Sequence, residues 1–341
     1  EWAHGARILS AIYDDVPFLE RAAAEFGATA LLLYCAPETT NGWCPVGTWD
    51  QVAYFIGQAR RFGLHVICYY DTTWTEACFH PDGPDDTCQR NPAGEPQTYR
   101  PPHVWQLRYA HCFNTPWSGR VAEIAARYVA AGAAGVFLDN PNYYTRNGLS
   151  CFCGTCRTRF AQDTGLALDA APEQTRTAWH QDSLCAHVAR VYQAMRRAAP
   201  DGRGLVITCN TANPTLPMQR LDSLGRAENV IFRETFPGHA DPQQALRQDA
   251  AVWPGKPLWV ILTEGGGSQA WRRDVGLAAA QFDTMLGHIL AVGACPMVWS
   301  SIPSQEPNRP GFTQASIYTS GPLGDVVARH FARARAARGA P

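Results

Sequence analysis

Short apolar runs alternate with amphipathic stretches along the whole chain, and this alternation limits the fold more than any other feature. Runs such as residues 30–33 and 258–262 are apolar at every position, which is typical of parallel strands whose two faces are both covered. Strands that alternate with helices in this way predict repeated β-α units around a parallel sheet. Eight strands are predicted, over residues 7–13, 29–34, 65–71, 135–140, 205–210, 229–235, 258–264 and 297–301.

Eight units that close on themselves predict an α/β fold, the (β/α)8 or TIM barrel. The chain has 341 residues, of which 46% are hydrophobic, and barrels of this length commonly form one domain. The sequence shows no internal linker and no low-complexity tract, so residues 1–341 are expected to form a single (β/α)8 domain. Long segments without clear periodicity follow the third and fourth strands, at 72–116 and 141–175, and loops of this length usually carry function.

The charge balance excludes two kinds of partner. The formal net charge is −1, so no basic field attracts the phosphates of nucleic acids or of an anionic membrane. No run of 18 apolar residues is present, and we therefore expect no membrane span. A neutral substrate fits better, and the 11 Trp, 12 Tyr and 14 Phe residues supply flat rings that can stack on it. Of the 29 basic residues only Lys256 is a lysine, which we interpret as the base composition of a GC-rich bacterial genome.

Polar and aromatic side chains follow the predicted strands at their C-terminal ends. In a (β/α)8 barrel these ends converge on one face, where the chemistry takes place. Carboxylates at such positions are costly unless they are paired or used, so this face is expected to be an active site. The residues expected to line a sugar site there are Asp14, Asp71, Trp74, Asn140, Asn210, Arg233 and Trp299.

Cleavage of a glycosidic bond needs two carboxyl groups, one protonated to assist the leaving oxygen and one ionised as nucleophile or base. Asp139 and Glu234 are the first candidates, because they end the predicted fourth and sixth strands and a sugar ring fits between these strands. Aromatic residues on both sides of Glu234 would desolvate it and suit it to the acid role. Glu264, which precedes three glycines, competes with Glu234. Each of these carboxylates could instead have a structural role.

A second group of residues consists of closely spaced thiols. Cys151, Cys153 and Cys156 place three sulfurs within six residues, a spacing that can surround one tetrahedral ion but does not easily pair internally as disulfides. Cys112, before the helix that leads into the fourth strand, is the best candidate for a fourth ligand. A zinc ion held by these four cysteines would be structural, because no coordination position stays open. Cysteines that are reduced or disulfide-bonded, without a metal, are the alternative, and no organic cofactor is expected.

These motifs together resemble those of a known group of enzymes. The family 42 β-galactosidases, and related hypothetical glycoside hydrolases with a (β/α)8 catalytic domain, have a similar arrangement of Cys112 with Asn114-Thr115-Pro116, Leu138-Asp139-Asn140, and Cys151-x-Cys153-x-x-Cys156 followed by Phe160. In the β-galactosidases a similar cysteine quartet binds zinc, and an Asn-Glu pair ends the fourth strand with the Glu as acid/base. The resemblance therefore implies a (β/α)8 fold and a structural zinc ion.

The chain departs from that pattern at the fourth strand. Asn140 is followed by Pro141, so the matching acid/base carboxylate is missing. The ending Gly-Val-Phe-Leu-Asp of residues 135–139 looks instead like that of α-glycosidases, whose fourth-strand Asp is the nucleophile and whose acid/base lies on the sixth strand. This likeness favours Asp139 with Glu234. If the β-galactosidase pattern held at the seventh strand, Glu264 would be the nucleophile and Asp139 the acid.

The sequence thus predicts a single-domain, retaining glycoside hydrolase that acts on an oligo- or polysaccharide. The alternative is a carbohydrate-binding barrel that has lost catalysis. A metal-dependent hydrolase is disfavoured because the histidines do not lie at strand ends. The oligomeric state and the compartment stay open: the thiols suit a reducing interior, whereas tryptophan-rich loops and a first residue that is not Met suit export, which we favour slightly.

Overall fold

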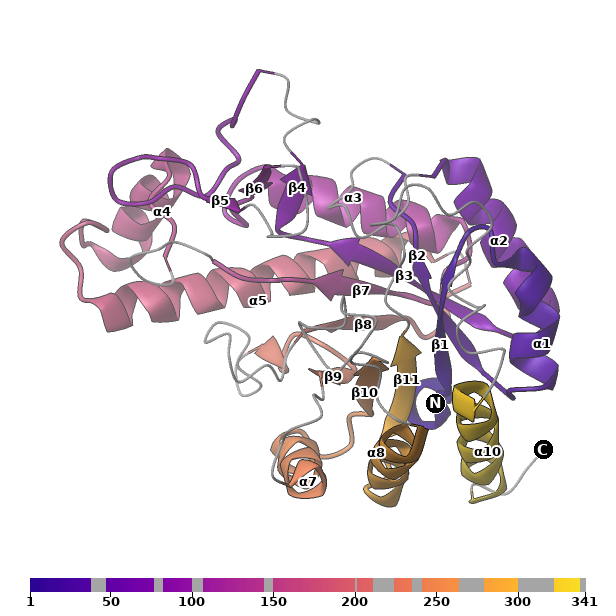
Figure 1. The fold of residues 1–341 in the computed structure, drawn as a ribbon. Helices are drawn as coiled ribbons and strands as arrows, with labels where there is room; N and C mark the ends of the chain where they lie inside the picture. Colours follow the sequence, from indigo (N-terminus) through magenta and orange to yellow (C-terminus); the bar gives the residue numbers. More distant parts are fainter. Residues whose placement is uncertain are drawn as a thin grey trace.

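The computed structural model describes residues 1–37, 47–76, 82–99, 107–143, 150–199, 201–210, 224–234, 241–263, 279–299 and 322–337. It confirms the predicted barrel, with eight parallel strands that nearly close and helices outside them (Figure 1). The order around the barrel is β8-β7-β3-β2-β1-β11-β10-β9. The strands are β1 (Ile8–Ile12), β2 (Ala30–Tyr34), β3 (His65–Asp71), β7 (Gly135–Asp139), β8 (Val206–Cys209), β9 (Ile231–Glu234), β10 (Leu258–Thr263) and β11 (Cys295–Trp299).

The helices that cover the barrel begin where local sequence signals favour a helix. At the start of α2, the Thr48 hydroxyl accepts from the Gln51 amide nitrogen and the Gln51 side chain accepts from the Thr48 nitrogen, which is a capping box. None of the described helices is long and apolar enough to cross a membrane. The helices are α1 (Leu19–Ala24), α2 (Trp49–Arg61), α3 (Trp117–Ala130), α4 (Gly154–Thr164), α5 (Glu173–Ala198), α7 (Pro242–Val252), α8 (Ala279–Ala291) and α10 (Pro322–Ala337).

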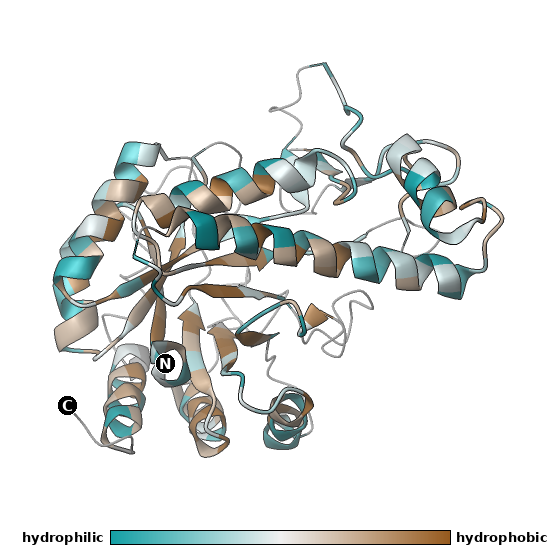
Figure 2. Cartoon of the chain, turned by 180° about the vertical axis from the view of Figure 1, so that it is seen from behind, coloured by the Kyte–Doolittle hydropathy of each residue, from teal (hydrophilic) through white to brown (hydrophobic). Residues whose placement is uncertain are grey.

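Successive strand residues face opposite sides of the barrel wall, and both sides are apolar. In β2, Leu31 and Leu33 belong to the cluster packed against the helices, whereas Leu32 and Tyr34 belong to the cluster inside the barrel. This period of two follows from the pleat of a strand. Figure 2 shows strands that are mostly hydrophobic and surrounding helices that carry both hydrophobic and hydrophilic residues.

The N-terminal residues cover one end of the barrel. Trp2, in a short 3-10 helix (Trp2–Gly5), stacks on His65 at the start of β3 with ring centroids 4.2 Å apart. The indole nitrogen of Trp259, inside the barrel near the start of β10, donates to the carbonyl oxygen of Ala3 at 2.9 Å. Since these residues lie at the N-terminal ends of the strands, the opposite end is left for the site.

The seam between β8 and β9 is closed largely by side chains. The main-chain nitrogen of Asn229 donates to the carbonyl oxygen of Ile207 at 3.2 Å, and the Asn229 side-chain oxygen accepts from the nitrogen of Ile207 at 2.9 Å. The carboxylate of Glu228 accepts from the nitrogen of Cys209 at 3.1 Å. The polar groups at this edge of β8 are thus satisfied without a regular ladder.

A second, three-stranded antiparallel sheet lies in the segment after β3, in which the sequence shows no periodicity. Its strands, in the order β4-β6-β5, are β4 (Trp74–Glu76), β5 (Thr98–Tyr99) and β6 (Arg108–Ala110). With two or three residues each, they are too short to produce an alternating pattern. The segment after β7 likewise contains an unpredicted helix, α4, and the 26-residue α5 extends beyond the barrel beside these elements (Figure 1).

A close approach between β7 and β8 yields a stability prediction. A Cβ atom on Gly135 would lie 2.4 Å from the carbonyl oxygen of Val206, its partner in β8. Gly135→Ala must therefore push two paired strands apart, and we expect a cost of about 1–3 kcal/mol, as for other overpacked cores. Thermal unfolding followed by circular dichroism should show a lowered Tm.

Gly57→Ala is the matched control. Gly57 lies in the exposed interior of α2, and a Cβ there would meet no atom within 4 Å. Alanine is the better helix former by about 1 kcal/mol, so Tm should stay or rise. A Gly135→Ala protein as stable as the wild type would contradict the close approach.

Candidate active site

Two carboxylates lie side by side at the C-terminal end of the barrel. Asp71 ends β3 and Asp139 ends β7, and the register of these neighbouring strands pairs the two residues directly. Asp71 is buried, whereas Asp139 is half-buried and reaches solvent. The structure therefore brings together two of the predicted site residues, with Asp139 as the accessible one.

Asn140 joins these two carboxylates. Its side-chain nitrogen donates to Asp139 Oδ2 at 2.9 Å and to Asp71 Oδ2 at 3.0 Å. Its backbone has a φ of 53°, in the left-handed region that asparagine tolerates better than most residues. The Thr73 hydroxyl donates to the carbonyl oxygen of Asn140, which holds this conformation. Asn140 thus fixes the distance between the two carboxylates.

Three further donors fix the orientation of the carboxylates. Asp71 Oδ1 accepts from the main-chain nitrogens of Thr73 at 3.0 Å and Trp74 at 2.9 Å. The hydroxyl of Tyr69 donates to Asp139 Oδ2. Tyr69 is not among the residues predicted from the sequence, although its position two residues before Asp71 on the same strand places it on the same face.

A buried arginine is the other unpredicted member of the site. Arg108 of β6 is only 1% exposed, and burial lowers its pKa while the nearby carboxylates of Asp71 and Glu76 oppose that shift. A guanidinium stays protonated at any ordinary pH, so Arg108 brings a buried positive charge near Asp71 and Glu76. It lies in a segment without periodicity, where no pattern marks it.

Aromatic rings line the barrel interior below and beside the carboxylates. Trp299, half-buried at the end of β11, stacks on Tyr34 with centroids 6.1 Å apart, and Tyr34 contacts Tyr69 at 4.5 Å. The row continues with Phe137, whose ring centroid lies 5.8 Å from that of Tyr69. Phe137 in turn contacts Phe232 of β9 edge-on, with centroids 4.6 Å apart. These rings leave an apolar floor beneath polar groups, as in many ligand sites.

The other predicted residues are placed differently. Asn210 is buried next to the end of β8, and Asp14 is exposed after β1. Arg233 lies on the outer face of β9 and pairs with Asp249 of α7 at 3.1 Å, so it does not reach the barrel interior. Only the backbone of Glu234, the last residue of β9, is described. Glu264 lies outside the described residues.

The four predicted cysteines gather in one buried cluster. Their sulfur atoms all lie within 4.8 Å of one another, with Cys112 Sγ 3.3 Å from Cys156 Sγ and 3.8 Å from Cys153 Sγ. Four sulfurs around a tetrahedral ion, at about 2.3 Å from it, lie about 3.8 Å apart. The cluster, which consists of Cys112, Cys151, Cys153 and Cys156, therefore has dimensions that could hold a metal ion.

The surroundings of the cluster also suit a cation. Hydrogen bonds from the other thiols lower the pKa of Cys153, whereas burial and its thiol neighbours raise the pKa of Cys112. The neighbouring thiols thus favour a thiolate at Cys153, and the thiolate is the form that binds a metal. The nitrogen of Arg90 points at Cys151 Sγ at 3.4 Å and the Asn114 amide at Cys156 Sγ at 3.4 Å, an arrangement of outer donors that is common around metal ligands.

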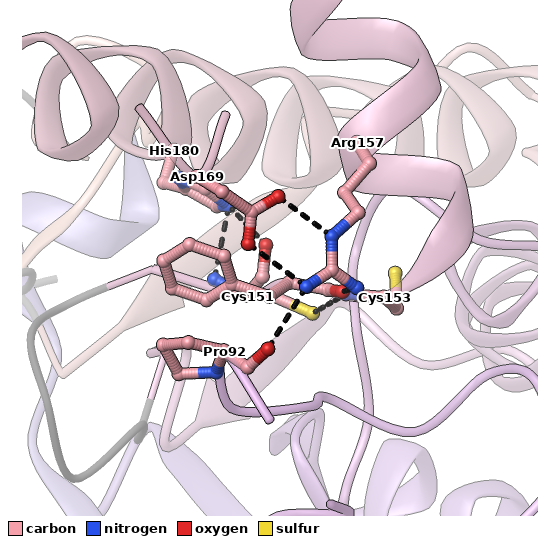
Figure 3. Close-up of polar contacts among 7 residues, drawn as sticks. Pro92, Cys151, Cys153, Arg157, Asp169 and His180 are labelled. Atoms are coloured by element: carbon pink, nitrogen blue, oxygen red, sulfur yellow. Dashed lines mark hydrogen bonds and ion pairs between the residues drawn. The ribbon is translucent and has the colours of Figure 1, made fainter. Parts of the chain in front are cut away.

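Arg157 of α4 ties the loop of the cluster to its neighbours (Figure 3). Its guanidinium forms a two-bond pair with Asp169, Nε to Oδ2 at 2.8 Å and Nη2 to Oδ1 at 2.9 Å. The same group donates to the carbonyl oxygens of Phe152 at 2.5 Å and Pro92 at 3.0 Å. It therefore joins the segments after β3 and after β7.

His180 of α5 supports the cluster from the opposite side (Figure 3). Its Nδ1 faces the carbonyl oxygen of Arg176 at 2.8 Å, and its Nε2 accepts from the main-chain nitrogen of Cys151 at 3.0 Å. The main-chain nitrogen of Cys151 can donate only to an unprotonated Nε2, which leaves the proton on Nδ1, and the carbonyl oxygen of Cys151 lies farther from Nε2, at 3.2 Å. Burial lowers the pKa of His180 to about 4, so the ring is neutral and is bonded through both nitrogens.

A second group of potential metal ligands lies near the small sheet. Asp85, Cys88 and His111 have ligand atoms within 4.8 Å of one another. However, both nitrogens of His111 face hydroxyls, Nε2 that of Thr75 at 2.6 Å and Nδ1 that of Thr87 at 2.8 Å. These contacts satisfy the ring without a metal.

The interior of this region yields a pH prediction at His187 of α5. His187 is buried, with Nε2 2.8 Å from Thr72 Oγ1 and Nδ1 2.9 Å from Ser118 Oγ. Burial lowers its pKa to about 3, against about 6.5 in an unfolded chain. The stability that comes from keeping this ring neutral is therefore complete above about pH 6.5. It is lost as the pH falls toward 3, by up to about 1.4 kcal/mol per pH unit.

His187→Gln keeps a hydrogen-bond donor and an acceptor but cannot titrate. Between pH 7 and pH 5 its free energy of unfolding should fall by about 2 kcal/mol less than that of the wild type. Urea unfolding at both pH values measures this difference. His4→Gln, at an exposed position, is the control and should follow the wild type. Identical pH dependence in His187→Gln and wild type would contradict the assignment.

Comparison with known proteins supports the fold. No protein-family model matches the chain, and no curated protein matches it. Solved structures do: the β-galactosidase of Rahnella sp. R3 is 14% identical with a TM-score of 0.67, and that of Bacillus circulans sp. alkalophilus is 13% identical with a TM-score of 0.66. Each alignment covers 97% of this chain and 56% of the β-galactosidase, so the chain spans little more than half of their length.

A third structure is similar over almost its whole length. The glycoside hydrolase domain of a PelA variant from Pseudomonas aeruginosa is 12% identical with a TM-score of 0.52, covering 88% of this chain and 96% of that domain. At these identities the likeness shows the fold. The chain has a TIM-barrel fold of the kind that glycoside hydrolases share.

Proposed function

We propose that this chain is a retaining glycoside hydrolase that acts on an oligo- or polysaccharide through Asp139 and Glu234, within a single (β/α)8 domain. One contact carries the proposal. Phe137 and Phe232 lie two residues before these carboxylates, and their rings meet across the barrel interior at 4.6 Å. Strand residues two apart share a face. Residues 139 and 234 are therefore expected to point into the barrel interior as well, one layer nearer the C-terminal ends of the strands, and to face one another there.

Asp139 is the proposed nucleophile. It is half-buried, so a substrate can reach it, and it accepts hydrogen bonds from the hydroxyl of Tyr69 and the amide of Asn140. Donors to a carboxylate hold it in one orientation, which favours attack on a fixed anomeric carbon. Asp71 is proposed to position Asn140 rather than to react, because it is buried and bonded to two main-chain nitrogens.

Glu234 is the proposed general acid/base. It is the last residue of β9 and pairs in register with Ile261 of β10. The apolar floor below it would disfavour its ionised form and suit it to protonating a leaving oxygen. Glu264, which follows β10 in the sequence, is the competing second carboxylate; in that alternative Glu264 would be the nucleophile and Asp139 the acid. Trp299 and Asn210 are proposed to contact the sugar.

The thiol cluster is proposed to hold a structural zinc ion. Cys112, Cys151, Cys153 and Cys156 would provide four thiolate ligands with no open position, a donor set typical of structural sites. The ion would supply stability and would not take part in the reaction. It would join the segment before α3 to the segment at the start of α4.

The catalytic proposal is tested by replacing one carboxylate at a time. Asp139→Asn and Glu234→Gln should each lower turnover about a hundredfold or more on a glycan that the wild type cleaves. Glu123→Gln, on the exposed face of α3, is the control and should keep full turnover. A panel of α- and β-linked glycans, with product anomers followed by NMR, measures both activity and stereochemistry.

Three results would contradict the proposal. Full turnover in Asp139→Asn would remove this residue from its role, and products of inverted configuration would exclude the retaining route. A wild-type protein that binds glycans without cleaving them would instead be a carbohydrate-binding barrel.

The metal proposal has its own test. The wild type should contain about one zinc ion per chain by elemental analysis, and Cys156→Ala should lose it, because three ligands hold zinc weakly. Cys68→Ala removes another fully buried thiol, in β3, and should keep the metal. Equal metal contents in Cys156→Ala and wild type would contradict the assignment.

A further inference from the structure

We propose that Tyr99, on the small antiparallel sheet, is the platform of an outer sugar-binding subsite, so that the substrate is a chain of several sugar units that extends from the carboxylates across this sheet. The inference rests on the proposed function and adds to it the length and the direction of the substrate. It is carried by the exposure of Tyr99, by the ring beneath it, and by the contacts that join this ring to Asp71.

Tyr99 is the exposed aromatic residue of the small sheet. Its side chain is 46% exposed, whereas Trp74 of the neighbouring strand β4 is only 6% exposed. The two rings lie 5.5 Å apart and are tilted by 46°. Trp74, which the sequence analysis assigned to the sugar site, therefore lies underneath, and Tyr99 is the ring that a ligand can reach.

The support beneath Tyr99 fixes the direction of its ring. Tyr99 belongs to β5 and pairs in register with Arg108 of β6, whose side chain is buried. A ring that rests on a buried tryptophan and a paired strand loses little conformational freedom when a ligand binds, so the entropy cost of binding is small. Rigid aromatic side chains of this kind are effective binding surfaces.

Trp74 connects the platform to the carboxylate pair. The main-chain nitrogen of Trp74 donates to Asp71 Oδ1 at 2.9 Å, and Asp71 is bonded through Asn140 to Asp139. Arg108 interacts electrostatically with both Asp71 and Tyr99. The exposed ring is thus connected to the proposed nucleophile through Trp74, Asp71 and Asn140, so a ligand that extends from Asp139 past Asp71 and Trp74 would reach it.

The chemistry of the ring selects a carbohydrate as the occupant. The C–H groups on one face of a sugar ring are apolar and electropositive, and they complement the negative face of an aromatic ring. The net charge of −1 gives no preference for an anionic chain. A neutral oligosaccharide that already has one unit at the carboxylates would place a later unit on Tyr99.

The test measures binding against chain length. Oligosaccharides of two to six units, derived from cellulose, β-1,4-galactan, starch and chitin, are titrated by calorimetry into Asp139→Asn protein, which keeps the size of the side chain and does not consume the ligand. Tyr99→Ala is then added in this background. For the chains that bind, we expect about tenfold weaker binding of the longer ones, which corresponds to about 1.4 kcal/mol, and almost no change for the disaccharides.

Two variants separate the platform from general damage. Tyr99→Phe keeps the ring and should bind as before. Tyr54→Ala removes a tyrosine that is 60% exposed on α2, where no subsite is proposed, and should also bind as before. An unchanged Tm for Tyr99→Ala would show that the fold is intact.

The outcomes also distinguish this inference from the proposed activity. Hydrolysis by the wild type together with equal binding by Tyr99→Ala at every length would overturn the subsite and leave the activity. Length-dependent loss in Tyr99→Ala without hydrolysis by the wild type would support the subsite and overturn the activity. No binding of any of these oligosaccharides would overturn the subsite.

Discussion

The pairing of Asp71 with Asp139 is the constraint around which the site is arranged. The register of β3 and β7 places two carboxylates on directly opposed residues, and like charges this close repel strongly in a partly buried region. The amide of Asn140 lies between them and donates to both. The buried guanidinium of Arg108 interacts favourably with the Asp71 carboxylate. Without these groups the strands could still pair, but the carboxylates would not stay together.

The groups that hold this pair in turn depend on the long segments outside the barrel. Thr72, between Asp71 and Thr73, is held on two sides, by the indole nitrogen of Trp117 at 2.7 Å from its carbonyl oxygen and by His187 at its hydroxyl. Trp117 begins α3, five residues after Cys112 of the thiol cluster. A metal in the cluster would therefore stabilise the site through packing, without touching the substrate.

The barrel could be predicted from the sequence because strands buried on both faces appear as continuous runs of apolar residues. Strands such as β2 and β10 are apolar throughout, and no surface helix has that pattern. The small sheet could not be predicted, since strands of two or three residues show no period, and Arg108 was missed with it. Arg233 shows a second reason why a site residue can be wrongly predicted from the sequence. A charged residue at a strand end suggests a site, but strand alternation turns it toward Asp249 of α7.

The seam between β8 and β9 connects the fold to the stereochemistry of the proposed reaction. Asp139 and Glu234 end the strands on either side of β8, so their separation depends on how β9 is joined to it. That junction is made by one main-chain hydrogen bond from Asn229 to Ile207 and by the side chains of Asn229 and Glu228, which constrain it less than a full backbone ladder would. Carboxyl groups about 5–5.5 Å apart retain configuration and wider pairs invert it. The side chains that close the barrel would then also set which of these reactions it can perform.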